Sequence, residues 1–466
     1  MIIAGGCSNA NPDEKFADPL GPGREHSNQA SVAADIDVEQ PVDTGTWQYL
    51  VTKPVRSDFS YDHGVTATEI RVGYNTDLSG ILDTWPTSYM AATKAYWGWV
   101  NDNGGIGGRQ VRAVELDSRF DGPTHLENYL TLASQGPESV VIIGQSTGWD
   151  QNLAISDRLV GDSLLAIPAS WNHDWIDPVV GQNILEVQTD YCLEAINGVT
   201  FMSQHHGPRM ALITLPGDYG QSAAVGARLA AKQLGLELVY DGAGSVDYGQ
   251  DVGPVVEAVG QSSPDFVWVA VHHTTLAQLA AAAVDHDIDT SWGGNSPSFS
   301  PDLLNTDGPG IELYDESYTH FSPTAMWGTI DSGGMATMMD ELGSRIPNER
   351  ATDVHIAAWT HATAVHQILI QAATDGDMTR SGVVAAANKV DVMFGGLAMD
   401  RNWRGEAGDY VARGSYAFDV DASVYSHHRN VSDPGSNNGF VIIDGPFVSD
   451  VAARVDYPNQ CEASNE

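Results

Sequence analysis

The sequence predicts an α/β fold of two lobes, each built on a mainly parallel sheet that is covered by helices. At 466 residues the chain exceeds the usual size of a single hydrophobic core, so two domains are expected. Hydrophobic residues make up 42% of it, which is enough to build folded cores. From residue 70 onward, short apolar runs rich in β-branched residues alternate with helix-length amphipathic stretches. Such alternation is typical of βαβ units, whose parallel sheets are buried on both faces.

The clearest strands are expected at residues 70–74, 111–116, 140–143, 210–215 and 266–271. The clearest helix lies between the first two strands and shows apolar residues at helical spacing: Tyr89, Ala92, Tyr96, Trp99 and Val100. A Gly-Gly-Ile-Gly-Gly run at 104–108 follows this helix and precedes a strand. Phosphate-binding loops follow a strand and open a helix, so a nucleotide-binding loop is excluded at this place.

The chain is strongly acidic, with 61 acidic residues, 22 basic residues and a formal net charge of -39. Nucleic acid and anionic membrane are therefore excluded as partners, because a phosphate surface requires a basic footprint. We interpret the acidity as serving solubility or adaptation to a salty medium, and the alternative is a surface that collects cations. The sequence lacks a run of about 18 apolar residues, so no segment is expected to cross a membrane as a helix.

The amino end carries Met-Ile-Ile-Ala-Gly-Gly-Cys at residues 1–7, which resembles the end of a bacterial lipoprotein signal. The resemblance makes Cys7 the candidate lipidation site. Ala4 stands where Leu is usual, and the charged and long apolar regions of a signal are missing, so we expect that an upstream start has been lost. The alternative is an ordinary cysteine in a tail. Residues 8 to about 45 are polar and cannot fold alone, so residues 1–65 are expected to form a lipoprotein-type end and a flexible tether.

The three cysteines, Cys7, Cys192 and Cys461, are far apart and match no metal-ligand spacing. A zinc site built on them is therefore not expected. In an oxidising compartment Cys192 and Cys461 either form a disulfide that pins the tail to the second lobe, or remain a buried thiol and an unpaired tail cysteine. The sequence alone favours neither.

Several segments together resemble periplasmic-binding proteins of the leucine/isoleucine/valine type. They are residues 66–73, 77–80 and 103–111 at the start, then 141–144, 166–169, 218–220 and 265–267, and more weakly 393–397. The resemblance implies the type I periplasmic-binding fold, in which two Rossmann-like lobes joined by a three-crossing hinge hold a ligand in the cleft between them. It places lobe 1 at residues 66–188 plus about 320–390, and lobe 2 at 189–319 plus about 391–460.

Candidate ligand-binding residues of lobe 1 lie in loops after strands, where open parallel sheets bind ligands. Trp85 either covers the ligand, as an aromatic near this place does in the family, or is a surface residue of the first helix. Ser146, Thr147 and Gly148 offer hydroxyl and N–H groups at a helix start, which suit a carboxylate or carbonyl oxygen. The alternative is an ordinary helix N-cap.

A second loop of lobe 1, Ala169, Ser170 and Trp171, aligns with a family loop that holds the same carboxylate. Trp171 stands where a small hydroxyl residue is common, so the resemblance implies a flatter, more aromatic pocket. This departure puts a simple aliphatic amino acid in doubt.

In lobe 2 the candidates are Tyr219 and His272, which match aromatic positions of the family, and Asn295. Amino-acid binders of the family usually carry a carboxylate near Asn295, yet no acid lies between Asp289 and Asp302. A buried ammonium without a counter-charge costs several kcal/mol, so either another acid serves or the ligand is not an α-amino acid. The adjacent histidines at 205–206, 272–273 and 427–428 are expected to point to opposite faces, which argues against joint metal binding.

Catalytic signatures are missing from the sequence, including Gly-x-Ser-x-Gly, His-Glu-x-x-His, a Walker loop and Cys-x-x-Cys. No catalytic residue, cofactor or metal is therefore expected. We predict an extracytoplasmic, lipid-anchored solute-binding component of an ABC importer, which delivers its ligand to a membrane permease. The ligand classes that suit the predicted cleft are amino acids, amides, urea-like solutes and small aromatic acids. The alternatives are a ligand-sensing receptor domain of the same fold and, less favoured, a hydrolase.

Overall fold

The computed structural model of the chain describes residues 47–80, 84–305, 310–427, 429–457 and 459–461. All of them belong to one compact unit that spans residues 37–466. The predicted lipidation site at Cys7 lies outside the described residues, as does the rest of 1–46.

The first lobe is built on a four-stranded sheet of order β3-β2-β4-β5, in which all neighbours are parallel. Its strands are β2 (Glu69–Thr76), β3 (Gln110–Asp117), β4 (Ile142–Ser146) and β5 (Ala166–Pro168). Its helices are α2 (Thr84–Asp102), α3 (Gly122–Leu132), α4 (Trp149–Leu153), α5 (Ser156–Gly161) and the 3-10 turn η1 (His173–Ile176). The expected strands and the expected helix near Tyr89 are confirmed, with shifts of one to three residues at their ends.

The second lobe is built on a seven-stranded sheet of order β13-β12-β10-β9-β8-β6-β7. Its strands are β6 (Arg209–Thr214), β7 (Glu237–Gly242), β8 (Phe266–Ala270), β9 (Ser291–Gly294), β10 (Tyr318–Ser322), β12 (Ser415–Val420) and β13 (Phe440–Phe447). The five neighbouring strands β7, β6, β8, β9 and β10 are parallel. Strand β12 pairs antiparallel with β10, and β13 pairs antiparallel with β12. Helical elements of this part are α6 (Tyr191–His206), α7 (Gly217–Leu234), α8 (Gly253–Ser262), α9 (His273–Asp285), α10 (Gly310–Ser317), α15 (Ala422–His427), α16 (Asp450–Arg454), η2 (Ser296–Ser298) and η3 (Pro301–Asn305).

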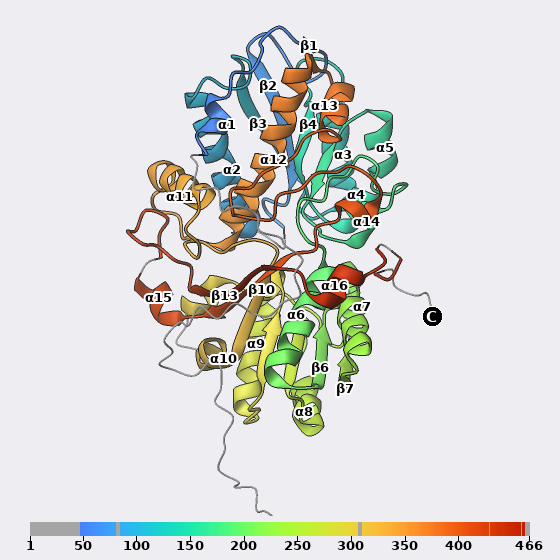
Figure 1. The fold of residues 1–466 in the computed structure, drawn as a ribbon, viewed down its shortest axis with the longest axis vertical. Helices are drawn as coiled ribbons and strands as arrows, with labels where there is room; N and C mark the ends of the chain where they lie inside the picture. The colour runs from blue at the N-terminus through green and yellow to red at the C-terminus, as the bar shows by residue number, and fades with distance from the viewer. Residues whose placement is uncertain (1–46, 81–83, 306–309, 428, 458, 462–466) are drawn as a thin grey trace, which may run out of the picture. The chain divides into compact units, whose positions relative to one another are not determined.

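Late segments of the chain return to the first lobe. They are α11 (Gly333–Arg345), α12 (Asp353–Asp375), β11 (Asp377–Met378), α13 (Arg380–Ala387) and α14 (Ala407–Tyr410). Figure 1 shows α12 and α13, in orange, among the N-terminal elements, and both α11 and α12 contact α2. The chain thus changes lobe between β5 and α6, between β10 and α11, and again between α13 and β12. This is the two-lobed, three-crossing α/β fold that the resemblance implies, and the fold class is confirmed.

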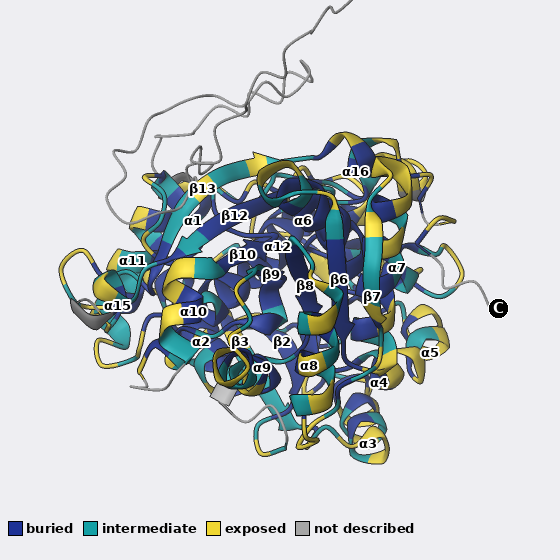
Figure 2. Cartoon of the chain, turned by 90° about the horizontal axis from the view of Figure 1, so that it is seen from below, coloured by how far each residue is buried: buried dark blue, intermediate teal, exposed yellow. Residues whose placement is uncertain are grey.

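The core is formed by strands that are buried on both faces and by two helices that are buried almost all round. In Figure 2, β6, β8, β9, α6 and α12 are mostly dark blue, whereas α8 and α10 expose their outer faces. Helix α6 lies so close to β8 that a Cβ added at Gly198 would stand 2.2 Å from the Trp268 indole. A residue without a side chain is therefore required at that contact.

Helix α12 joins α2 through buried aromatic and histidine side chains. The Tyr89 hydroxyl lies 2.8 Å from His361 Nδ1, and the Tyr96 hydroxyl lies 2.9 Å from His366 Nδ1. Burial lowers the pKa of both histidines to about 3, so the rings are neutral and serve packing. No helix in the described part of the chain is long and apolar enough to span a membrane.

Residues 47–65, which the sequence analysis assigned to the tether, are folded onto the first lobe. They contain α1 (Tyr49–Thr52) and β1 (Ser60–Tyr61), and β1 pairs with β11. Trp47, Leu50, Phe59 and Val65 are buried in the core. The end of the predicted tether at residue 65 is therefore too late, because apolar side chains after residue 46 already find partners on lobe 1.

Cys192, on α6, and Cys461 form a disulfide with Cα atoms 5.9 Å apart. The bond fixes the last described residues to the second lobe, beside the α16–α6 contact. Of the two alternatives that the sequence left open, the structure has the disulfide.

Candidate functional site

Two of the predicted loops lie side by side at the carboxyl edge of the four-stranded sheet. Ser146 is the last residue of β4, and its carbonyl accepts a hydrogen bond of 2.8 Å from the Ala169 N–H, directly after β5. The Thr147 N–H donates to the Asn75 carbonyl at the end of β2, over 3.1 Å. Ser146, Thr147 and Ser170 therefore sit on one rim, as expected where parallel strands end together.

The hydroxyls of Ser146 and Thr147 are buried and engaged within lobe 1. Ser146 Oγ lies 2.9 Å from His125 Nε2, and Thr147 Oγ1 donates to the Asn75 carbonyl over 3.2 Å. Burial lowers the pKa of His125 to about 4, which keeps its ring neutral. Neither residue caps α4, because the N-cap is Gly148, with φ of 80° and no side-chain cap. This loop thus presents a left-handed glycine at a helix start, not an ordinary Ser or Thr cap.

On the second lobe, Tyr219 ties together the ends of two strands. It lies in the first turn of α7, and its hydroxyl donates to Asn295 Oδ1 over 2.6 Å. The same hydroxyl lies 3.2 Å from the Val271 carbonyl, just after β8. Asn295 follows β9 and is fully buried. These contacts place Tyr219 and Asn295 together at the carboxyl edge of the seven-stranded sheet.

The two rims meet through a hydrogen bond and a row of aromatic rings. Ser170 Oγ on lobe 1 donates to Asp218 Oδ2 on lobe 2 over 3.1 Å. The Trp171 and Tyr191 ring centroids lie 5.9 Å apart, and those of Tyr191 and Tyr219 lie 4.7 Å apart. Burial raises the pKa of Asp218, against the lowering effect of the Ser170 hydrogen bond. The facing rims therefore offer a carboxyl, hydroxyls and aromatic faces that contact one another. We call them the interlobe rims; their residues are Ser146, Thr147, Ser170 and Trp171 on lobe 1 and Tyr191, Asp218, Tyr219 and Asn295 on lobe 2.

A buried acid, Glu194, lies behind the second rim. It projects from α6, and its Oε1 accepts hydrogen bonds from Ser296 N (3.2 Å) and Ser296 Oγ (2.7 Å). Burial raises the pKa of Glu194 to about 8, although the Ser296 hydrogen bonds lower it. The segment after β9 has no acid of its own, and the carboxyl that contacts it comes from α6.

Two predicted residues stand apart from these contacts. Trp85, in the first turn of α2, stacks on Tyr89 with ring centroids 5.1 Å apart. His272 is the N-cap of α9 and lies half-buried beside His273, with ring centroids 4.0 Å apart. The expectation that this histidine pair points to opposite faces is therefore wrong, because the pair lies at a helix start and not within a strand. His205 and His206 also lie on a helix, α6, and not within a strand.

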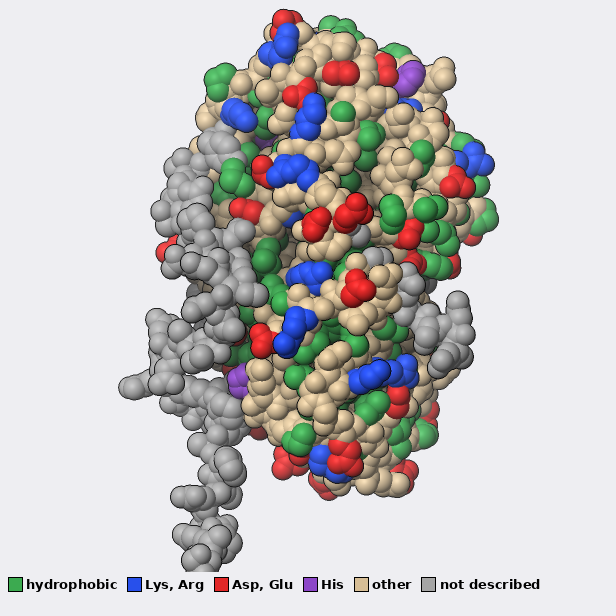
Figure 3. Space-filling model, turned by 45° about the vertical axis from the view of Figure 1, so that its right-hand side comes forward, with side chains coloured by type: hydrophobic (Ala, Val, Ile, Leu, Met, Phe, Trp, Pro, Cys, Tyr) green, Lys and Arg blue, Asp and Glu red, His purple; other side chains and the backbone are tan. Residues whose placement is uncertain are grey.

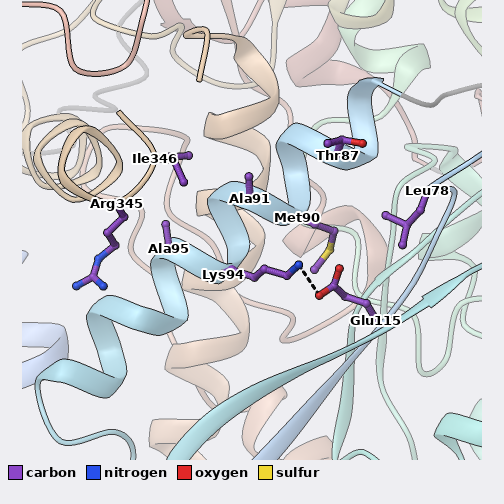
Figure 4. Close-up of a pocket in the computed structure, with 9 residues that line it drawn as sticks. All are labelled: Leu78, Thr87, Met90, Ala91, Lys94, Ala95, Glu115, Arg345 and Ile346. Carbon is purple, nitrogen blue, oxygen red and sulfur yellow. Dashed lines mark ion pairs between the residues drawn. The ribbon is translucent and has the colours of Figure 1, made fainter. Parts of the chain in front are cut away.

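A cavity of about 650 Å³ lies on α2, away from the interlobe rims. Figure 4 shows its lining: Leu78, Thr87, Met90, Ala91, Lys94, Ala95, Glu115, Arg345 and Ile346. Its charged groups are already paired, since Lys94 Nζ lies 2.7 Å from Glu115 Oε1 and Arg345 is bound to Glu341 and Asp102. No group in it was predicted as a site residue.

Among the described residues, one group has the ligand types and spacing of a metal site: Asp190, Cys192 and Cys461. Because both cysteines are in the disulfide, they offer no thiolate, and the group does not fit a metal ion. On the face shown in Figure 3, basic side chains lie singly or in small groups among acidic ones, without a continuous basic patch.

The sequence analysis missed Asp218, Tyr191 and Glu194. Asp218 directly precedes Tyr219 in the Asp-Tyr-Gly motif, so its place on the rim was readable from the motif. The indication for Glu194 was weaker, since it is only the one charged residue in the mainly apolar stretch from Tyr191 to Met202. Its contact with Ser296 joins residues 102 positions apart and was not readable.

A family described as periplasmic binding protein matches residues 69–423 of the chain. Among solved structures, the chain is similar to a fatty acid ABC transporter substrate-binding protein from Thermomonospora curvata, with 24% identity, a TM-score of 0.74, and 86% of this chain and 97% of that one covered. It is also similar to a branched chain amino acid ABC transporter from Thermus thermophilus with bound valine, with 16% identity, a TM-score of 0.71 and coverage of 84% and 99%.

A solute binding protein from Rhodopseudomonas palustris HaA2 in complex with p-hydroxybenzoic acid shares 13% identity, with a TM-score of 0.63 and coverage of 76% and 93%. No curated protein sequence matches the chain. The structural likenesses, at these identities, concern the fold. The family match covers well over half of the chain, and the chain therefore belongs to the periplasmic binding protein family.

Proposed function

We propose that this chain is the solute-binding component of an ABC importer and captures a small, polar, amino-acid-like molecule between its two lobes. The family indicates a place outside the cytoplasm. The proposal rests on the hydrogen bond from Ser170 to Asp218, which joins the carboxyl edges of the two sheets. Open α/β sheets bind ligands at such edges, and closure over a ligand gives a permease a distinct shape to recognise.

The chemistry of the rims supports a ligand with both hydrogen-bonding groups and an apolar body. Ser170 and Tyr219 offer hydroxyls, Asp218 and Glu194 offer carboxyls, and Trp171 offers an aromatic face of low exposure. A carboxyl in this position suits the ammonium or amide N–H of a ligand. An ammonium group placed beside Glu194 would favour loss of its proton, so α6 offers the carboxyl that the acid-free segment after β9 lacks. Ser146, Thr147, Gly148, Ala169, Asn295, Trp85 and His272 remain candidates of the same proposal, as does lipid anchoring at Cys7.

A thermal-shift screen tests the proposal. The probes are valine and other amino acids, short amides, urea, p-hydroxybenzoate and a medium-chain fatty acid. A probe at about 100 times its dissociation constant stabilises the chain by about 2.7 kcal/mol. We expect a hit among the amino acids, amides or hydroxybenzoate.

The hit is then assigned to the interlobe rims by matched variants. Ser170→Ala removes a hydroxyl from the rim, and Ser344→Ala removes an exposed one from α11. Loss of one hydrogen bond to a ligand corresponds to about a tenfold weaker binding. Ser170→Ala and Tyr219→Phe are expected to weaken the hit by about this factor, and Ser344→Ala to leave it unchanged. Equal affinity in all of these proteins refutes binding at the rims.

A further inference from the structure

A second cavity, of about 180 Å³, lies where the first and third crossings of the chain run side by side. Its lining includes Glu186 from the first crossing and Arg401 and Trp403 from the third. Trp403 Nε1 donates to the Glu186 carbonyl over 3.1 Å, which ties the two crossings together. None of the predicted ligand-binding residues lines this space. We call it the hinge cavity.

Two groups of opposite type, the Glu186 carboxyl and the Arg401 guanidinium, are buried in the lining of the hinge cavity. Glu186 is 2% exposed and Arg401 is 8% exposed. Within the described part of the chain, neither carboxyl oxygen of Glu186 has a hydrogen-bond partner, and Arg401 Nε and Nη1 have none either. Arg401 is held in place by one hydrogen bond of 3.2 Å from Nη2 to the Tyr410 carbonyl, and its guanidinium lies 4.9 Å from the centre of the Trp403 ring.

Such an arrangement is costly unless something occupies the gap. A buried carboxylate or guanidinium without partners loses several kcal/mol of hydration. Burial, and then the nearby charge of Asp190, raise the pKa of Glu186 well above its usual range, although Arg401 opposes this. Burial lowers the pKa of Arg401 to about 10, which leaves it cationic at neutral pH. Both shifts are those of charged groups that lack a close counter-charge.

We propose that the hinge cavity binds a compact zwitterion, whose carboxylate pairs with Arg401 and whose ammonium group pairs with Glu186. An anion alone would pair with Arg401 and leave Glu186 without a partner, whereas an ammonium group beside Glu186 would restore its charge, so a molecule with both groups satisfies both walls. The cavity volume of about 180 Å³ leaves room for a molecule of the size of glycine. Ile176 and Trp175 provide apolar walls for its carbon atoms. This site is separate from the interlobe rims and does not rest on the function proposed for them.

Calorimetric titration of the full chain with glycine, acetate and methylammonium tests the charge requirement. Glycine carries both charges, and the other two carry one each. We expect glycine to bind at least tenfold more tightly than either single-charge probe. Acetate binding as tightly as glycine overturns the proposal, because Arg401 alone then forms an anion site. No binding of any probe also overturns it, because the cavity then holds only water.

Variants assign the glycine site to the hinge cavity. Glu186→Gln keeps the side-chain shape and removes the charge, so it is expected to fold and to raise the glycine dissociation constant tenfold or more. Arg401→Lys is a second variant with the same expectation, and Ser344→Ala, an exposed position on α11, is the control expected to leave glycine binding unchanged. Glycine binding that Ser170→Ala weakens and Glu186→Gln does not is binding at the rims, and it refutes the hinge site. A crystal structure in glycine is expected to show the molecule between Glu186 and Arg401.

Discussion

The buried carboxyl of Glu194 predicts a specific pH dependence of stability. Its pKa in the folded chain is about 8, against an ordinary value of 4.5, chiefly because it is buried. Between these two values the unfolded chain has released the proton and the folded chain still holds it. The unfolded state therefore binds fewer protons, and the free energy of unfolding falls as pH rises through this window. The shift of about 3.5 pKa units corresponds to at most about 5 kcal/mol.

Glu194→Gln removes this dependence, because an amide does not titrate and its oxygen still accepts from Ser296. We expect the variant to gain up to about 5 kcal/mol relative to the unmodified chain between pH 4.5 and 8, with no further gain above that. Urea unfolding followed by tryptophan fluorescence at a series of pH values measures the difference, in which all other titrating groups cancel. Glu127→Gln, an exposed carboxyl on α3, is the control. Parallel stability curves for Glu194→Gln and the unmodified chain would refute the reasoning.

Three further predictions concern the fold and the rims. Cys461→Ser opens the disulfide to Cys192, whose loop of 269 residues restricts the unfolded chain, and is expected to lower the free energy of unfolding by about 2–5 kcal/mol in urea titrations. The unmodified chain should show the same loss in reductant, and the variant should be insensitive to it. Arg380→Met leaves four carbonyls without the buried guanidinium and should cost about 3 kcal/mol by the same assay, whereas Arg380→Lys should cost less. Tyr219→Phe leaves Asn295 Oδ1 with the Ser298 hydroxyl alone and should destabilise the unliganded chain by about 1 kcal/mol, measured as a lower thermal midpoint.

The fold was predictable from the sequence because its signals are local. Residues 70–74 and 266–271 have the continuous apolar character of strands buried on both faces, and the structure buries them on both faces. The start of the folded chain was harder to predict, because Trp47 lies against Gly334 of α11 and against Gly395, which are distant in sequence.

The candidate site was predictable only where a residue follows a strand. Ser146 ends β4, and Ser170 and Tyr219 come shortly after β5 and β6, so these segments could be named in advance. Glu194 and Glu186 do not, because one projects from a helix and the other lies in a crossing between lobes. These two carboxyls stand out because they are buried without a sufficient counter-charge. Their burial depends on contacts with residues far along the chain, so the sequence did not reveal it.

The segment from residue 186 to 194 links the hinge cavity to the interlobe rims through consecutive contacts. Glu186 lines the cavity, Asp190 caps α6 by accepting from Cys192 N and Leu193 N, and Tyr191 packs between Trp171 and Tyr219. A ligand that neutralises Glu186 also reduces its repulsion with Asp190, the charge that the helix N-terminus favours. Occupancy of the hinge cavity is therefore expected to affect the position of Tyr191 through the first turn of α6, and any difference in affinity that one ligand imposes on the other must be reciprocal.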